Sequence, residues 1–261
     1  MINIKKYFIQ ELSYKKDVKL SLSIYIFNFT LIFLFTVALF YFMFTSVSYT
    51  FNWSSIYEYK QKFFDGFLIT IVISFFALIL SFIIGLFFAY GQSSKLIALR
   101  FLSRFYIEGI RGTPLLVQIL IFYYVFANSL GLENRYVVGV VILALFSGAY
   151  VSEIIRAAIQ SIEKDQFEAS LSLGMDNYQL YRYIIFPQAF KRMLPALTGQ
   201  FASIIKDSSL LSIISISEFT MNAQEVNAYT YSTLESYIPL AIGYLFLTYP
   251  ISYYTSKLEK K

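Results

Sequence analysis

The chain contains no cysteine and no histidine among its 261 residues. Disulfide bonds, thiol chemistry, and sites that use histidine to bind a metal or transfer a proton are therefore excluded. Charged residues are also scarce, at 14% of the chain, and no stretch matches the GxxxxGK pattern of a phosphate-binding loop. The sequence thus provides no ATP-hydrolysing site of that type and leaves little length for a soluble domain.

Apolar residues make up 57% of the chain and aromatic residues 20%. They gather into runs of the length that crosses a bilayer, and these runs lack the alternation typical of barrel strands. We therefore predict an all-α membrane protein with six transmembrane helices, since lipid accepts only helices or closed barrels. The predicted spans are residues 22–44, 66–90, 114–128, 137–158, 195–217 and 237–254.

The lysines and arginines predict the orientation of these helices. With the N-terminus inside, 17 of the 21 basic residues lie on the inner side, three lie in outer loops, and Lys206 lies within a span. Such an excess is typical of cytoplasmic segments. We therefore expect both termini and the 159–193 segment to be cytoplasmic, with an extra helix and an outer loop within residues 1–65.

The 159–193 segment, called the handle below, is a long polar interval between apolar runs. It contains the stretch EASLSLGMDNYQLYRYIIFP, residues 168–187. Gly174 offers a low-cost helix break, and Pro187 favours the start of a further helix. We expect a short amphipathic helix, a turn at Gly174, and a second helix that ends near Phe186. This arrangement suits the binding of a soluble partner.

The residues at 168–187 resemble the EAA loop of ABC importer permeases. That pattern reads Glu-Ala-Ala, three residues, Gly, nine residues, Ile, any residue, Leu, Pro. Here Glu168, Ala169, Ser170, Gly174 and Pro187 keep its spacing, and the sequence differs in a serine for the second alanine and a phenylalanine for the leucine. In this family the loop docks a separate ATPase subunit. The resemblance therefore implies that these five residues couple the chain to an ATPase.

Three further stretches resemble core helices of the polar amino-acid uptake branch of these permeases, namely RGTPLLVQ at 111–118, SGAYVSEIIR at 147–156 and KDSSL at 206–210. The resemblance implies a five-helix type I permease domain over residues 66–256. It also implies a second permease subunit, identical or homologous, a cytoplasmic ATPase dimer that binds ATP and Mg²⁺, and an extracytoplasmic amino-acid-binding protein. This chain itself is expected to hold no cofactor or metal and to have no nucleic-acid partner.

Five polar residues within the predicted spans are candidates for the substrate pathway. Glu153 and Arg156 share a helix face and are able to pair, either in the pathway or as a brace. Lys206 and Asp207 are adjacent, so each needs its own partner or lines the cavity. Gln118 lies one turn into its span and is a weaker lining candidate. Charge facing lipid costs about 2.5–3.5 kcal/mol, so such groups normally face protein or water.

Two other classes of function remain open on the sequence. An ion-coupled secondary transporter would work without an ATPase, but the two related halves with broken helices that are typical of many such proteins are not evident. An intramembrane enzyme is disfavoured by the absence of histidine and cysteine. The leading prediction is thus a transport subunit of the bacterial inner membrane, not an enzyme, that imports polar amino acids.

Overall fold

A computed structural model describes residues 21–45 and 49–259, and these residues form helices joined by short turns, with no strand among them. The chain divides into two compact units, residues 1–51 and 52–261. In the first unit, helix α2 (Leu22–Thr45) is apolar on all sides, as a helix surrounded by lipid is. The elements of the second unit, in chain order, are α3 (Ser54–Glu58), α4 (Lys60–Gln92), α5 (Ile97–Arg111), α6 (Leu115–Ile121), the π-helix η1 (Phe122–Ala127), α7 (Arg135–Gln160), α8 (Lys164–Ser172), α9 (Asn177–Gln179), the π-helix η2 (Leu180–Ile185), α10 (Phe186–Asp207), the 3₁₀-helix η3 (Ser208–Ile214), α11 (Phe219–Thr230) and α12 (Thr233–Glu259).

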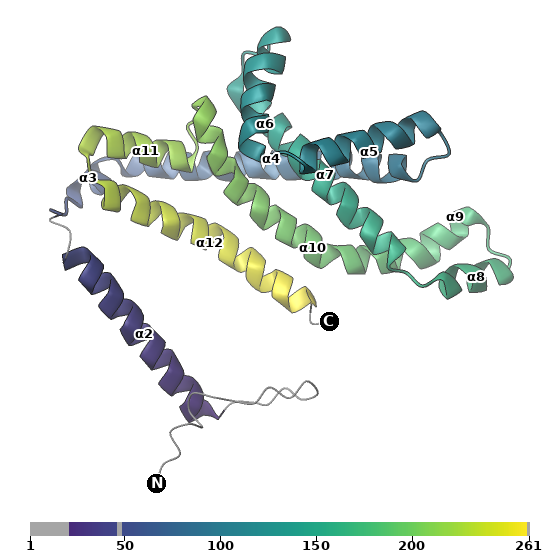
Figure 1. Cartoon of the computed structure of the whole chain (residues 1–261), viewed down its shortest axis with the longest axis horizontal. Helices are drawn as coiled ribbons and strands as arrows, with labels where there is room; N and C mark the ends of the chain where they lie inside the picture. The colour runs from purple at the N-terminus through teal and green to yellow at the C-terminus, as the bar shows by residue number, and fades with distance from the viewer. Residues whose placement is uncertain (1–20, 46–48, 260–261) are drawn as a thin grey trace. The chain divides into compact units, whose positions relative to one another are not determined.

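Helices α4 and α7 form the centre of the second unit, and α10 packs against both of them and against α12 (Figure 1). Small residues allow α4 and α7 to approach closely. A Cβ atom added to Gly85 would lie 2.5 Å from a Val151 methyl group, and one added to Gly148 would lie 2.6 Å from Ile84. Only glycine fits such contacts, which are common where membrane helices meet.

The two ends of this bundle are named here by the residues that lie at each. Gln92 at the end of α4 contacts Glu153 near the end of α7, and α8 and α9 project beyond this end. We call it the handle end. At the opposite or far end, Gly66 near the start of α4 meets α11, and Arg135 at the start of α7 bonds to Ser215. Helices α4 and α7 therefore run in the same direction.

Three described helices are long and apolar enough to cross a membrane: α2 over Leu22–Met43, α4, and α7. The pair formed by α5 and the 115–127 segment would make a fourth span, although the chain bends by 110° between its two parts. Helices α10 and α12 are 22 and 27 residues long but carry more polar side chains and prolines. The structure thus confirms an all-helical fold, and the count of six spans remains a prediction.

The predicted boundaries fail at α10. The sequence placed a helix end near Phe186 and the start of the next span at Pro195, but one continuous helical run passes through both, from α9 through η2 to the end of α10. Pro187 lies in the first turn of α10, where its missing N–H is tolerated. Pro195 lies inside α10, where it removes one backbone donor without ending the helix.

Candidate functional site

The first limb of the handle is α8, and a left-handed turn ends it. Gly174 has φ +78°, a conformation that L side chains rarely adopt. Its N–H donates to Leu171 O at 2.9 Å, and the N–H of Met175 donates to Ser170 O at 3.2 Å. These two bonds make a Schellman motif, which satisfies the carbonyl groups at the end of α8. The structure therefore places the predicted turn at Gly174.

The second limb starts with a reciprocal cap. The Asp176 carboxylate accepts from the N–H of Gln179 at 2.8 Å, and the Gln179 side chain accepts from the N–H of Asp176 at 3.1 Å. This capping box fixes where the second helix begins. From there the chain continues through η2 into α10 without a break. The second limb of the handle is therefore the end of a long membrane-domain helix rather than a separate short helix.

The EAA-type residues of α8 divide into one buried and two exposed positions. Ser170, which replaces the second alanine of the pattern, is buried, and its hydroxyl donates to Gln166 O at 2.6 Å. The helix thus satisfies this hydroxyl internally, which explains why serine is accepted there. Glu168 and Ala169 are exposed, and the described residues offer Glu168 no ion pair. Beside them, Leu171 and Leu173 are also exposed, the latter at 79%.

The handle is fastened to both helices that support it. Arg192 on α10 donates to the carbonyl of Ser161, directly after α7, and to its hydroxyl oxygen at 3.0 Å. An apolar cluster that includes Ile162, Leu180 and Ile185 joins the handle to the ends of α4, α7 and α10. A force on α8 is therefore passed to α7 and α10 together.

At the handle end of the membrane helices, Glu153 is the centre of a charged cluster. Arg156 donates to it through Nε at 2.9 Å and through Nη2 at 2.7 Å, a two-point contact from one turn away on α7. Gln92 of α4 donates to Glu153 Oε1 at 3.1 Å, and Arg111 at the end of α5 donates to Oε2 at 3.2 Å. The carboxylate therefore ties three helices together, and its contact to Arg111 is the longest of the four.

This charged cluster borders a cavity of about 330 Å³. Three arginines and two glutamates line it, so the cavity offers both signs of charge; with Gln92 and Ile107, the lining residues are Arg104, Glu108, Arg111, Glu153 and Arg156. The i, i+3 pairing of Glu153 and Arg156 was visible in the sequence. The contacts of Gln92 and Arg111 were not, because they lie 61 and 42 residues from Glu153.

Gln118 does not lie beside this cavity. It is buried, and its amide nitrogen donates to Ile110 O at 2.7 Å and to the Thr113 hydroxyl at 2.7 Å. These acceptors lie at the end of α5 and in the bend that leads to α6. Its amide therefore caps the last turn of α5, whose carbonyls would otherwise lack partners, and its place in the solute pathway stays a prediction.

Lys206 and Asp207 lie in the last turn of α10, away from the charged cluster. Lys206 is exposed and Asp207 is half-buried, and neither forms an ion pair within the described part of the chain. The hydroxyl of the adjacent Ser208 donates to Ile205 O rather than to Asp207. The structure therefore does not bring these two residues together with Glu153 and Arg156, and they form a second polar position in the bundle.

Comparison with known proteins shows the family to which the chain belongs. Residues 81–261 match the family model described as "Binding-protein-dependent transport system inner membrane component". The chain belongs to this family. Its relatives include the glutamine transport system permease protein GlnP of Escherichia coli K12, at 34% identity over 81% of this chain and 97% of the relative. A putative glutamine permease of Rickettsia bellii is 36% identical over 79% of this chain and 98% of the relative.

Solved structures agree with the fold of this permease. A crystal structure of an amino acid ABC transporter with histidines contains a chain that is 37% identical, with a TM-score of 0.75, over 81% of the permease and 99% of that chain. A chain of the MetNI methionine ABC transporter, in an inward-facing conformation, aligns with a TM-score of 0.59 at 16% identity, over 76% of the permease and 93% of that chain. The second similarity concerns the fold alone.

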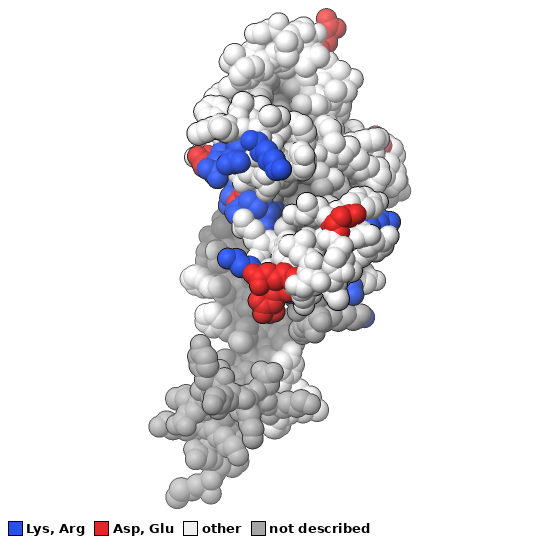
Figure 2. Space-filling model, turned by 90° about the vertical axis from the view of Figure 1, so that its right-hand side faces the viewer, with Lys and Arg blue, Asp and Glu red and all other residues white. Residues whose placement is uncertain are grey.

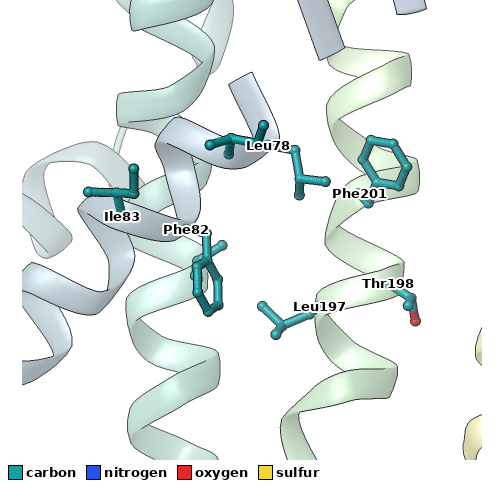
Figure 3. Close-up of a pocket in the computed structure, with 8 residues that line it drawn as sticks. Leu78, Phe82, Ile83, Leu197, Thr198 and Phe201 are labelled. Carbon is teal, nitrogen blue, oxygen red and sulfur yellow. The ribbon is translucent and has the colours of Figure 1, made fainter. Parts of the chain in front are cut away.

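An apolar pocket of about 390 Å³ opens between α4, α7 and α10 of the permease. Leu78 and Phe82 of α4 face Leu197 and Phe201 of α10 across it (Figure 3). Thr198 supplies the one hydroxyl of the lining, and this group already donates to Pro195 O and accepts from Thr255. A polar solute would find no free partner there, so the pocket is unsuited to an amino acid.

The three glutamates of the 218–236 segment of the permease all make contacts within the chain. Glu218 and Glu235 are both fully buried. Glu218 caps α11 by accepting from the N–H groups of Thr220 and Met221 at 2.9 and 2.7 Å. The third acid, Glu225, forms an ion pair with Lys62. The structure therefore uses these carboxylates in contacts within the chain.

Proposed function

We propose that this chain is the membrane-spanning permease subunit of an ATP-driven, binding-protein-dependent importer of polar amino acids. The observation that carries the proposal is α8, a short helix that projects from the bundle and exposes Glu168 beside Leu171 and Leu173. Within residues 21–45 and 49–259, no basic side chain forms an ion pair with Glu168. Exposed apolar side chains gathered on one helix are typical of a protein interface. Glutamine permeases are among its relatives, which supports glutamine or a similar amide amino acid as the solute.

In this proposal a cytoplasmic ATPase dimer docks on the 168–178 segments of two permease subunits, identical or homologous, through Glu168, Ala169, Ser170 and Gly174. The ATPases bind ATP and Mg²⁺, and this chain holds no cofactor and catalyses no reaction. ATP binding draws the handles together, and the Arg192–Ser161 contact transmits this movement to α7 and α10. The helices then open toward an extracytoplasmic binding protein that delivers the amino acid, and hydrolysis resets them.

The handle end is assigned to the cytoplasm of a bacterial cell, with both termini on that side of the inner membrane. Figure 2 looks onto the handle end and shows basic and acidic side chains gathered there on a surface that is otherwise mostly uncharged. Basic residues at this end include Lys95, Arg100, Arg104, Lys164 and Arg182. An excess of lysine and arginine is typical of cytoplasmic segments.

Glu153 and Arg156 are proposed to lie in the solute pathway, at its cytoplasmic end. All four contacts to the Glu153 carboxylate are filled in this structure, so an α-ammonium group binds there only by displacing a donor. Arg111 has the longest contact, at 3.2 Å, and is the donor that we expect to leave. A Glu153→Gln variant is expected to transport with altered selectivity. Unchanged selectivity would remove Glu153 from the solute-binding residues.

Co-purification with the ATPase tests the docking function. The change is Glu168→Ala, and the matched control is Glu133→Ala, an equally exposed carboxylate near the far end of the bundle. We expect the ATPase to be lost or strongly reduced only in the Glu168 variant. If both variants retain the ATPase equally and uptake continues after ATP depletion, the chain acts as an ion-coupled transporter instead.

A further inference from the structure

Helix α5 has a buried side and an exposed apolar side. Its buried side packs on α4 and α7, where the Tyr106 ring stacks on Phe88 with 3.9 Å between their centres. On the exposed side, Ile97, Phe101 and Phe105 follow at a spacing of four residues and therefore share one helix face. They are 67%, 68% and 79% exposed, respectively. We call these three residues the α5 apolar face.

The α5 apolar face runs along the same direction as the central helices. A Cβ atom added to Gly91 would meet the Ser103 hydroxyl, and Phe88, one turn earlier on α4, lies beside Tyr106, one turn later on α5. Helix α5 is therefore antiparallel to α4 and starts at the handle end. From Ile97 to Phe105 it rises about 12 Å, which is most of the roughly 15 Å that one leaflet contributes to the hydrocarbon core.

A row of basic residues lies beside this face at the handle end. Lys95, Arg100 and Arg104 are the basic residues between Asp65 and Glu108, and this interval contains no acidic residue. We call these three the basic row. Arg100 and Arg104 lie one turn apart on the same side of α5, where like charges repel each other. No carboxylate of the described residues forms an ion pair with the row, so the described chain does not neutralise its charge.

The basic row is held ready for an anion. Arg100 donates to the carbonyl of Ser94, in the turn before α5, through Nε at 3.2 Å and through Nη2 at 2.8 Å. These two bonds fix its guanidinium group at the handle end. Arg104 is exposed and borders the cavity beside the charged cluster. A guanidinium group presents its N–H donors in a planar fork that matches the oxygens of a phosphate group.

We propose that the basic row and the α5 apolar face bind one anionic phospholipid of the cytoplasmic leaflet, with its phosphate group at Arg100 and Arg104 and an acyl chain along Phe101 and Phe105. This inference rests on the proposed cytoplasmic position of the handle end. A molecule that covers both surfaces needs an anionic group at the handle end and an apolar body that extends along the helix. A phospholipid has its parts in this order, and basic pockets between membrane helices on the cytoplasmic side bind such headgroups.

Glu108 limits where the headgroup lies. It is exposed, lies one turn deeper than Arg104, and borders the same cavity. Its negative charge repels a phosphate group, so the headgroup stays on the handle-end side of Arg104. The site therefore predicts opposite effects for two neighbouring substitutions: Arg104→Gln weakens the binding of an anionic lipid, and Glu108→Gln strengthens it.

Native mass spectrometry of the transporter, assembled with its ATPase, measures this binding. The complex is titrated with phosphatidylglycerol, which is anionic, or with phosphatidylcholine, which has no net charge. We expect Arg104→Gln to weaken the binding of phosphatidylglycerol about tenfold, because a charged hydrogen bond is lost. The matched control is Lys257→Gln, which removes the same charge from an exposed side chain in the last turn of α12 and should leave the binding unchanged. Soluble glycerol phosphate, which has no acyl chain, should not displace the lipid.

Three results of this titration would overturn the site. Equal losses in Arg104→Gln and Lys257→Gln would indicate a general attraction of anionic lipid to basic residues near the membrane. Equal affinities for phosphatidylglycerol and phosphatidylcholine would remove the role of the basic row. Displacement by glycerol phosphate would indicate a site for a free phosphate compound, without a contribution from the α5 apolar face.

Photo-cross-linking tests what covers the α5 apolar face. With p-benzoyl-phenylalanine in place of Phe105, in lipid discs that contain equal amounts of the two lipids, we expect adducts mainly with phosphatidylglycerol. The control position is Phe35, which is 68% exposed on the uncharged helix α2 and should react with both lipids equally. Adducts of position 105 with the second permease subunit or with the ATPase, or equally with both lipids, would overturn the inference. Neither experiment measures uptake, so failure of the proposed transport function would be seen separately, as a lack of ATP-dependent uptake.

Discussion

Replacing Gly174 with alanine adds a methyl group to a residue whose φ is +78°. No atom lies within 4 Å of the position of that methyl group, so the cost comes only from the left-handed backbone. This cost is about 1–2 kcal/mol for an L-residue. The free handle relaxes out of the strained turn and must form it again when the ATPase docks. We therefore expect the ATPase to bind the Gly174→Ala permease about 5- to 30-fold more weakly.

The chain provides a matched control for this change. Gly131 has φ +64°, has no atom within 4 Å of its added Cβ, and ends a helix with the same pair of backbone bonds, but it lies near the far end. Gly131→Ala carries the same strain and should leave ATPase binding unchanged. Gly174→Asn should recover part of the affinity, because asparagine tolerates the left-handed region. The assay is titration of the ATPase against permease in lipid discs. Equal effects of the two alanine variants would refute the reasoning.

Two further pairs of variants concern the bundle itself, and the free energy of unfolding in lipid discs is measured for each. Gly85→Ala places a methyl group 2.5 Å from a valine of α7 and should destabilise by about 1–3 kcal/mol. Gly109→Ala, in the last turn of α5, meets no atom within 4 Å and should instead stabilise by up to about 0.5–1 kcal/mol. Thr70→Val removes the acceptor of the buried Phe219 N–H, at 3.1 Å, and should cost about 1–3 kcal/mol. Thr248→Val loses only a bond to its own helix and should cost less.

Local rules were enough to predict several features. The turn at Gly174 follows from the positive φ that glycine accepts, and the Glu153–Arg156 contact follows from helical spacing, so both were visible within a few residues of sequence. The long apolar runs of α2, α4 and α7 are likewise recognisable in the sequence as membrane spans. The family resemblance added the expectation that the handle docks an ATPase, because the motif spacing is specific.

Other features depend on contacts between distant residues or on an unusual helix type. The sequence predicts a helix end near Phe186 and the start of a span at Pro195, yet one helical run continues through both residues. Gln118 caps a bend of 110° that no local pattern announces. Glu218 is buried because α11 folds back onto α4, a contact between segments about 150 residues apart that no local pattern indicates.

The most direct test of the account is uptake by the purified permease in proteoliposomes, with the binding protein and labelled glutamine on one side and ATP on the other. The account predicts accumulation only when the ATPase is present, and its loss in the Glu168→Ala variant. Accumulation by the permease alone, at the same rate with and without the ATPase, would contradict it.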